Sequence, residues 1–168
     1  TGLSVCTLAS IGYFVNSENS NGQTVCLAGS YSSSTGLSTC TGAPVGSHVS
    51  NTGATAPTLC NPGYYADIVQ LVECIPSTPG HFVSGSGASN QSNCLEGSFT
   101  SVSASIECLS SPIGSYVPSA EATSSNYCVA GKFTDTTGSS SCLSSPAGSF
   151  VDTIGATSAQ QCDRGTFS

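Results

Sequence analysis

The chain has 168 residues, a formal net charge of −7 and only two basic side chains, and 52 of its residues are Ser or Thr. Two cations cannot displace the counterions of nucleic acid or of an anionic lipid surface, so partners of both kinds are excluded. With no Trp, no Met and 7% aromatic residues, the chain lacks the large side chains that fill an ordinary enzyme core. No apolar run approaches the roughly 18 residues of a membrane helix, so no membrane insertion is expected.

Ten cysteines recur at intervals that alternate between twenty and fourteen positions, which together give a 34-residue repeat. A fixed period of this size indicates a tandem-repeat protein. Numerous thiols in a chain with little core indicate an oxidising compartment, so we expect an extracellular or cell-surface protein held by disulfides. No secretory leader is visible, and we expect it to have been removed or to lie upstream. The predicted array has a partial first repeat at 1–25, full repeats at 26–59, 60–93, 94–127 and 128–161, and the start of a next repeat at 162–168.

A finer period divides each repeat into two unlike 17-residue modules. Each module has a Gly followed two residues later by a ring, as in Gly12 with Phe14 and Gly46 with His48. The Gly is expected to supply a positive φ at a turn. The ring is expected to lie on the same face of a short strand, where it covers a disulfide or the next module. These glycines are Gly12, Gly29, Gly46, Gly63, Gly80, Gly97, Gly114, Gly131, Gly148 and Gly165.

Small polar segments between these motifs, such as 34–36 and 136–138, are expected to be hairpin tips. The segment 67–72 departs from this pattern because it is mostly apolar, which we interpret as drift rather than as a contact patch. Recurrent Gly and Pro exclude any helix longer than about two turns. The sequence therefore predicts a small, disulfide-rich, β-poor fold, an elongated tandem-repeat rod of short hairpin modules without substantial helix.

The segments 26–31 (Cys-Leu-Ala-Gly-Ser-Tyr) and 128–133 (Cys-Val-Ala-Gly-Lys-Phe) resemble the cysteine-rich repeats of ephrin-receptor-like and tumour-necrosis-factor-receptor-like ectodomains. The resemblance covers the whole chain, and such repeats serve receptors, matrix proteins and surface proteins alike. The usual pattern, Cys-Pro-x-Gly-x-Tyr followed by a Gly-bearing tip and Cys-x2-Cys, is not kept throughout. Ser145, for example, stands where these repeats have Cys.

This departure bears on the disulfide pairing, for which the register leaves two alternatives: partners fourteen positions apart or partners twenty positions apart. Alternate modules lack both cysteines of a pair, and the two positions without cysteine, such as Ala43 and Pro57, lie fourteen residues apart. Modules of one family should have their disulfide at the same positions, which predicts the pairs Cys26–Cys40, Cys60–Cys74, Cys94–Cys108 and Cys128–Cys142.

The main argument against this pairing is that it leaves Cys6 and Cys162 without internal partners, whereas pairing across the longer interval satisfies all ten cysteines. We expect Cys162 of one copy to bond Cys6 of the next, head to tail, which would make an open filament. The expected partners are therefore copies of the chain itself.

Nothing in the sequence indicates catalysis, a metal or a cofactor. The acidic residues are scattered singly, without paired carboxylates or a nucleophile–base–acid pattern, so no enzyme activity is expected. Structural zinc favours closely spaced Cys pairs, and the shortest interval between cysteines here is fourteen positions. His48 replaces a packing ring and His81 adjoins Phe82, so both are expected to be structural.

Covalent glycans are the one modification that the sequence favours, because hydroxyl side chains are abundant and charges are few. Asn90 begins the chain's one N-glycan sequon, Asn-Gln-Ser. The candidate O-glycan acceptors are Ser32, Ser33, Ser34, Thr35, Ser139, Ser140 and Ser141.

These observations predict a structural extracellular repeat protein, a subunit or segment of a filament, surface coat or cell appendage. The alternative is a receptor-like ectodomain stalk or ligand-binding module. A receptor should diverge where its ligand docks and expose aromatic or Arg anchors. The copies here are nearly uniform and Arg164 is the only Arg, which favours the structural role.

Overall fold

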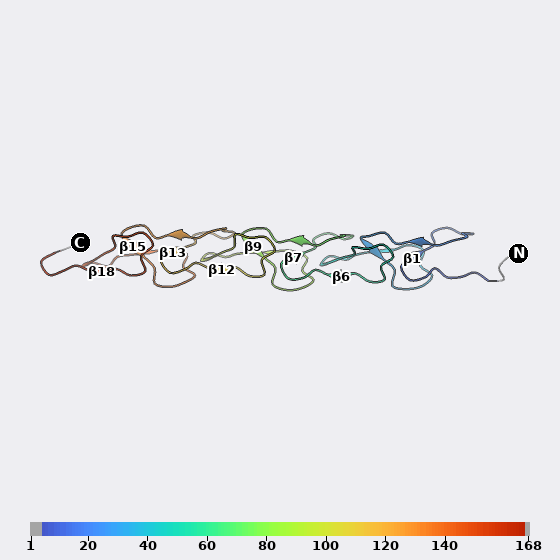
Figure 1. Ribbon diagram of the computed structural model, residues 1–168, viewed down its shortest axis with the longest axis horizontal. Helices are drawn as coiled ribbons and strands as arrows, with labels where there is room; N and C mark the ends of the chain where they lie inside the picture. The colour runs from blue at the N-terminus through green and yellow to red at the C-terminus, as the bar shows by residue number, and fades with distance from the viewer. Residues whose placement is uncertain (1–4, 167–168) are drawn as a thin grey trace. The chain divides into compact units, whose positions relative to one another are not determined.

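The computed structural model describes residues 5–166, and over those residues it consists of nine two-stranded antiparallel hairpins and no helix (Figure 1). The ends of the expected array, residues 1–4 and 167–168, lie outside the described residues. None of the described residues forms a helix that could cross a membrane. The predicted small tandem-hairpin fold is confirmed.

Each strand has two residues and pairs with its neighbour in the chain, β1 with β2 and so on to β17 with β18. The strands are β1 (Tyr13–Phe14), β2 (Thr24–Val25), β3 (Ser30–Tyr31), β4 (Thr41–Gly42), β5 (Ser47–His48), β6 (Thr58–Leu59), β7 (Tyr64–Tyr65), β8 (Ile75–Pro76), β9 (His81–Phe82), β10 (Ser92–Asn93), β11 (Ser98–Phe99), β12 (Leu109–Ser110), β13 (Ser115–Tyr116), β14 (Asn126–Tyr127), β15 (Lys132–Phe133), β16 (Leu143–Ser144), β17 (Ser149–Phe150) and β18 (Gln160–Gln161).

A β-turn precedes the first strand of each hairpin, and the Gly that recurs at every seventeenth position, here called the turn glycine, is its third residue. In the first turn, the N–H of Tyr13 donates to the carbonyl of Ser10 at 3.0 Å. The turn glycines have φ between 76° and 87°, so the predicted positive φ is confirmed. The strand pair closes when the residue fourteen positions later donates back to the glycine carbonyl, as Cys26 does to Gly12 at 2.9 Å.

A second residue with positive φ lies seven positions after each of the turn glycines from Gly12 to Gly148, at the far end of the hairpin, and is here called the tip residue. From Gly36 onward, its N–H donates to a carbonyl of the preceding module, as Gly36 does to Ala9 at 2.8 Å. Five tip residues are Gly and four are not, so the bend is kept even where a side chain makes it costly. The tip residues are Asn19, Gly36, Gly53, Gln70, Gly87, Ala104, Glu121, Gly138 and Gly155.

The chain divides into two compact units, residues 1–76 with 85–90 and residues 77–84 with 91–168. The first unit contains the hairpins from β1 to β8, and the second contains those from β9 to β18. The division falls inside the expected repeat 60–93, because the tip segment 85–90 belongs to the first unit and the strands β9 and β10 belong to the second.

In the first unit, each hairpin bonds to the next through its backbone. Gly12 N–H donates to the Ser32 carbonyl at 2.9 Å, and Val15 N–H donates to the Leu37 carbonyl at 3.0 Å. Turn glycines of this unit also touch the tip two modules later, since a Cβ atom on Gly12 would collide with the Gly53 carbonyl. The position therefore requires Gly for its φ and for this close approach.

The second unit repeats the same bonds in the same register. Gly97 N–H donates to the Val117 carbonyl at 2.9 Å, and Glu121 N–H donates to the Cys94 carbonyl at 2.8 Å. A Cβ atom on Gly97 would collide with the Gly138 carbonyl. Within each unit the modules thus gain most of their contacts from near neighbours, as in other repeat proteins.

The core of each unit is a narrow line of small side chains rather than a cluster of large ones. Most of them come from two positions of the modules, three residues before and three residues after the turn glycine, and Ser47, Ser105, Ser115 and Ser149 are buried as well. Modules with a disulfide, here called stapled, have Ser, Ala or Thr at the later position, and modules without one, here called unstapled, have Val. The buried residues at these positions are Ala9, Cys26, Ser32, Ala43, Val49, Cys60 and Ala66 in the first unit, and Ser77, Val83, Cys94, Thr100, Ser111, Val117, Cys128, Thr134 and Val151 in the second.

Candidate functional site

Four disulfides join the ends of the hairpins in the stapled modules. Each connects an inner cysteine, three residues before the turn glycine, to an outer cysteine, eleven residues after it. The inner cysteines have no exposed surface and the outer ones are half-buried. The Cα–Cα distances are 5.7 or 5.8 Å, as ordinary disulfides require. The pairs have the 14-residue separation expected from the sequence: Cys26–Cys40, Cys60–Cys74, Cys94–Cys108 and Cys128–Cys142.

Two unstapled modules have a hydrogen bond where the stapled ones have a disulfide. Gln23 occupies an outer position, and its Oε1 accepts from the N–H of Ser10 at 2.7 Å. Gln91 does the same for the N–H of Thr78 at 2.8 Å. Sequence reasoning treated these positions only as lost cysteines. The recurrence of Gln at the same position two repeats later was the signal that could have identified the bond.

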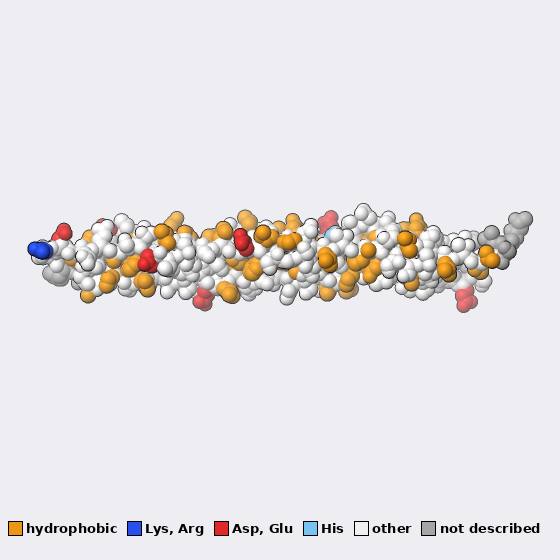
Figure 2. Space-filling view, turned by 90° about the horizontal axis from the view of Figure 1, so that it is seen from below, with side chains coloured by type: hydrophobic (Ala, Val, Ile, Leu, Met, Phe, Trp, Pro, Cys, Tyr) orange, Lys and Arg blue, Asp and Glu red, His pale blue; other side chains and the backbone are white. Residues whose placement is uncertain are grey.

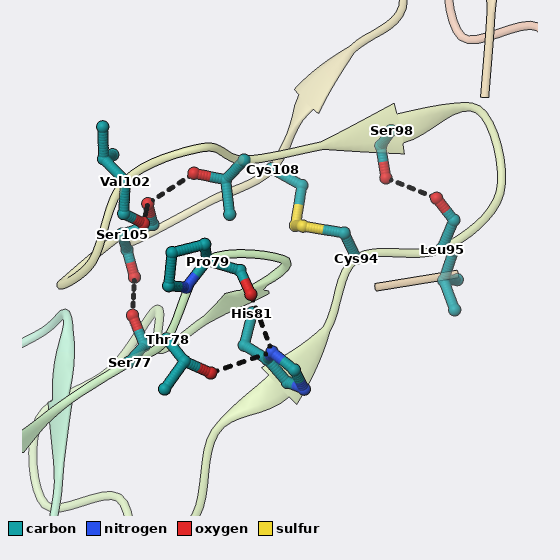
Figure 3. Close-up of a disulfide and its surroundings, with 11 residues drawn as sticks. Ser77, Thr78, Pro79, His81, Cys94, Leu95, Ser98, Val102, Ser105 and Cys108 are labelled. Carbon is teal, nitrogen blue, oxygen red and sulfur yellow. Dashed lines mark hydrogen bonds between the residues drawn. A yellow bond between two sulfur atoms is a disulfide. The ribbon is translucent and has the colours of Figure 1, made fainter. Parts of the chain in front are cut away.

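Serine at the inner position of an unstapled module makes a further bond to the next module. Ser77 Oγ donates to the Ser105 carbonyl at 3.3 Å, as Figure 3 shows beside the Cys94–Cys108 disulfide. Ser111 Oγ donates to the Ser139 carbonyl at 3.1 Å. A buried hydroxyl needs a partner, and here the partner connects two hairpins.

Buried hydroxyls within the stapled modules of the second unit also find partners. Thr100 Oγ1 lies 2.7 Å from Ser105 Oγ, and Thr134 Oγ1 lies 2.8 Å from Ser139 Oγ. In both modules the two side chains are five residues apart. The unstapled modules of this unit have Val and Ala at these two positions, for example Val117 with Ala122, so the polar pair is replaced as a pair.

The predicted contact between a ring and a disulfide occurs in the first unit. His48 of β5 places its Nδ1 3.2 Å from Sγ of Cys74. The ring nitrogen and the sulfurs of Cys60 and Cys74 all lie within 4.8 Å of one another. Among the described residues, no other three His, Cys, Asp or Glu side chains converge in this way. Since the two sulfurs are bonded to each other, metal coordination here would require that bond to be broken.

One repeat earlier in the 34-residue register, Phe14 takes the place of His48. Phe14 and Cys40 line the same surface cavity, which has a volume of about 460 Å³. The ring position and the outer cysteine are thus near one cavity in that repeat, and in the next repeat the histidine brings a hydrogen-bonding atom to the sulfur.

His81, the other histidine, has a local structural role, as the sequence suggested. Its Nδ1 lies 3.1 Å from Thr78 Oγ1 and 3.3 Å from the Pro79 carbonyl (Figure 3). Thr78 in turn bonds to Gln91. His81 thus belongs to the polar group that replaces a disulfide in this module.

Within the part of the chain that the structure describes, two cysteines, Cys6 and Cys162, are outside any disulfide. Cys6 is exposed and occupies an outer position, and Cys162 is half-buried and occupies an inner one. Cys6 lines an open groove of about 750 Å³, to which Leu8, Val15 and Leu37 also contribute.

The candidate glycosylation residues differ in accessibility. Ser32 is fully buried and its hydroxyl donates to the Ser34 carbonyl at 3.0 Å, so it is not accessible to a transferase in the folded chain. Ser139 is half-buried, and its hydroxyl takes part in bonds to Thr134 and Thr136. The candidates that are exposed are Ser33, Ser34, Thr35, Asn90, Ser140 and Ser141.

One tip of the first unit is apolar. Ile68, Val69 and Val72 are 58%, 59% and 46% exposed at the end of the β7–β8 hairpin. Four large apolar residues lie between positions 68 and 72 of this tip, whereas the tip at 101–107 exposes two, Val102 and Ile106. On the face shown in Figure 2, apolar side chains are in general dispersed among polar ones, and charged side chains are few.

No protein-family model matches the chain, and no curated protein sequence matches it.

Proposed function

We propose that the chain is a structural extracellular protein, a subunit or segment of a filament, surface coat or cell appendage. The observation that carries the proposal is the constant backbone register within each unit. Successive modules bond through their turn glycines and tips in the same way, as for Gly29 to Val49 and Gly97 to Val117. Repetition of one contact suits a protein whose role is to extend and support a structure rather than to transform a substrate.

The disulfides support an extracellular location for the protein. Four disulfides in one chain indicate an oxidising environment, because cytosolic reductants keep thiols reduced. We place the protein outside the cell, where a structure with a narrow core benefits most from covalent cross-links.

For assembly, the proposed contact is a disulfide from Cys162 of one copy to Cys6 of the next. Each disulfide of the chain joins an inner cysteine to an outer one. Cys162 occupies an inner position and Cys6 an outer position, so the two are complementary. If the position of Cys6 is moved forward by five 34-residue repeats, it falls fourteen positions after Cys162. This is the separation found in the other disulfides. The groove that Cys6 lines would receive the segment that contains Cys162, directly after β18.

Two variants test this contact. Cys6→Ser and Cys162→Ser should each remove disulfide-linked multimers from non-reducing gels. An equimolar mixture of the two should form covalent dimers and nothing larger, because each pair of copies retains one complementary pair of thiols. Electron microscopy of the unmodified protein should show filaments with a regular axial repeat. Monomers only, or a Cys6–Cys6 link, would contradict the proposed assembly.

Carbohydrate on the exposed hairpin tips belongs to the same proposal. The hydroxyls of Ser33, Ser34 and Thr35, and those of Ser140 and Ser141, face solvent, and a chain with few charges needs other groups to stay soluble. The intact mass of the native protein should exceed that of the 16.7 kDa polypeptide. A mass equal to that of the bare chain would exclude these glycans.

The apolar tip favours a second candidate, a receptor-like stalk or ligand-binding module. Exposed Ile68, Val69 and Val72 would give a partner a small apolar anchor. The resemblance of segment 26–31 to receptor ectodomain repeats also supports this function. Replacing the three residues by Ser should abolish retention on a partner surface if the chain is a binding module, and should leave filaments unchanged if it is structural.

A further inference from the structure

We propose that Cys60–Cys74 is a thiol-exchange site, a disulfide that low-molecular-weight thiols open and reform with the help of His48. The other three disulfides remain closed under the same conditions. The inference goes beyond the structural role and does not depend on head-to-tail assembly, because all three residues lie inside the first unit.

The geometry of the site gives its two sulfurs different roles. Cys60 has no exposed surface, so an incoming thiolate has to attack the half-buried Cys74. His48 Nδ1 is 3.2 Å from that sulfur, which is hydrogen-bond distance for a contact to sulfur. A ring N–H at this position donates to whichever form of Cys74 is present.

The exchange proceeds in two balanced steps. A thiolate attacks Cys74 Sγ, the Cys60–Cys74 bond breaks, and a mixed disulfide forms at Cys74 while Cys60 leaves as a thiolate and takes up a proton. A second thiolate then attacks the sulfur of the small molecule, forms the small-molecule disulfide, and releases Cys74 as a thiolate. The two electrons that reduce the protein come from the two thiols, and His48 donates to the sulfur that leaves in the second step.

His48 favours the reduced form because it binds the two forms unequally. A disulfide sulfur is a weak acceptor, whereas a thiolate is charged and accepts a strong hydrogen bond. A hydrogen bond to a charged group is worth a factor of about ten or more in an equilibrium constant. A disulfide whose reduced form is stabilised is the more easily reduced one.

The chain contains its own controls. In the 34-residue register, the residues that correspond to His48 are Phe14, Phe82 and Tyr116, each one module before another disulfide. Phe14 and Cys40 line the same cavity, and a Phe ring offers the sulfur no hydrogen-bond donor. All four outer cysteines are half-buried, so exposure alone does not distinguish Cys74. The histidine does.

The test is an equilibrium titration of the folded, oxidised protein with mixtures of reduced and oxidised dithiothreitol at one fixed pH. Free thiols are alkylated at each point, and the four disulfides are followed by mass spectrometry after cleavage at acidic residues, since the chain has only two basic ones. We expect Cys60–Cys74 to be half-reduced at a ratio of reduced to oxidised dithiothreitol about tenfold below that for Cys94–Cys108.

Two reciprocal variants separate the effect of the histidine from that of its surroundings. His48→Phe should bring Cys60–Cys74 to the level of the other three disulfides. Phe82→His should make Cys94–Cys108 about tenfold easier to reduce than it is in the unmodified chain. Formation of all four disulfides in each variant verifies folding. The inference is overturned if Cys60–Cys74 opens together with or after the others, or if neither variant changes the order.

Discussion

The stapled hairpin at 94–110 and the unstapled hairpin at 111–127 share their turn, strand pairing and backbone bonds to neighbours, yet their cores differ. The first is closed by Cys94–Cys108 and buries Thr100 with its hydroxyl bonded. The second buries Val117 completely, and Ser111 donates a hydrogen bond to the next hairpin. In this pair, covalent closure accompanies a buried hydroxyl and its absence accompanies a buried Val; the other stapled modules have Ser32, Ala66 and Thr134 at the position of Thr100. The same backbone is stabilised in two ways that alternate along the chain.

Removing a disulfide should lower the stability of the protein more than any other change proposed here. Cys94→Ala with Cys108→Ala opens a 14-residue loop, which should lower the free energy of unfolding by about 3 kcal/mol. Urea unfolding without reductant measures the loss. The matched control is Ser111→Ala with Ser125→Ala in the unstapled hairpin, where one hydrogen bond is lost and about 1 kcal/mol is expected. Equal losses in the two pairs would contradict the distinction.

Adding a disulfide to an unstapled module is the converse test, because it should raise the stability of the protein. Ser77→Cys with Gln91→Cys places an inner and an outer cysteine in an unstapled module. The new loop should add about 3 kcal/mol, and the loss of the Gln91 and Ser77 hydrogen bonds should together subtract about 2 kcal/mol. A net gain of about 1 kcal/mol in urea unfolding is expected, and peptide mapping verifies the new disulfide between positions 77 and 91. No gain despite a formed link would show that the alternation does not reflect stability.

Exchanging the core residues between module types should have an effect of similar size. Val117→Thr introduces a hydroxyl that faces Ala122 instead of the Ser found in the stapled modules of the second unit. An unpaired buried hydroxyl should destabilise the protein by about 1–2 kcal/mol in urea unfolding. The reciprocal Thr100→Val should cost less, because Ser105 keeps its bond to the Val102 carbonyl. A larger loss for Thr100→Val would reverse this interpretation.

The smallest effect is expected where a hydrogen bond replaces a staple. Gln91→Ala should cost about 1 kcal/mol, and Gln23→Ala should cost a similar amount, because each leaves one backbone N–H without its partner. Ser125→Ala, at the corresponding position of another unstapled module, removes no such bond and serves as the control. Hydrogen exchange at the Thr78 amide would report the local loss directly.

Sequence reasoning predicted the hairpins and the turn glycines because these features recur at fixed intervals. It predicted the 14-residue disulfide separation because alternate modules lack both cysteines of a pair at positions fourteen apart. It missed the positive φ at Gln70 and Glu121, because the glycine that usually signals such a φ is absent from both positions. The bond at Gln91 was also missed, because a lost cysteine says nothing about what replaces it. Ser32 and Ser33 looked alike as hydroxyls, but alternating side-chain directions bury only the first.

The contact between a turn glycine and the tip two modules later could not be predicted either. It joins residues far apart in the chain, as Gly12 and Gly53 are, and depends on how the modules stack rather than on any local pattern. Linear spacing identifies the positions that need glycine, but only the arrangement of hairpins reveals the carbonyl that excludes a side chain there.

The closed 14-residue loops also limit how far the protein can be stretched. A fully extended 34-residue repeat without cross-links would span about 120 Å. With its staple intact, the loop contributes only the 5.7 Å between the two Cα atoms, and the rest of the repeat contributes about 70 Å. The disulfide therefore prevents an applied force from extending more than a third of the contour length of each repeat. If Cys60–Cys74 alone opens to a thiol, a pulled molecule would lengthen by one discrete step at one known place.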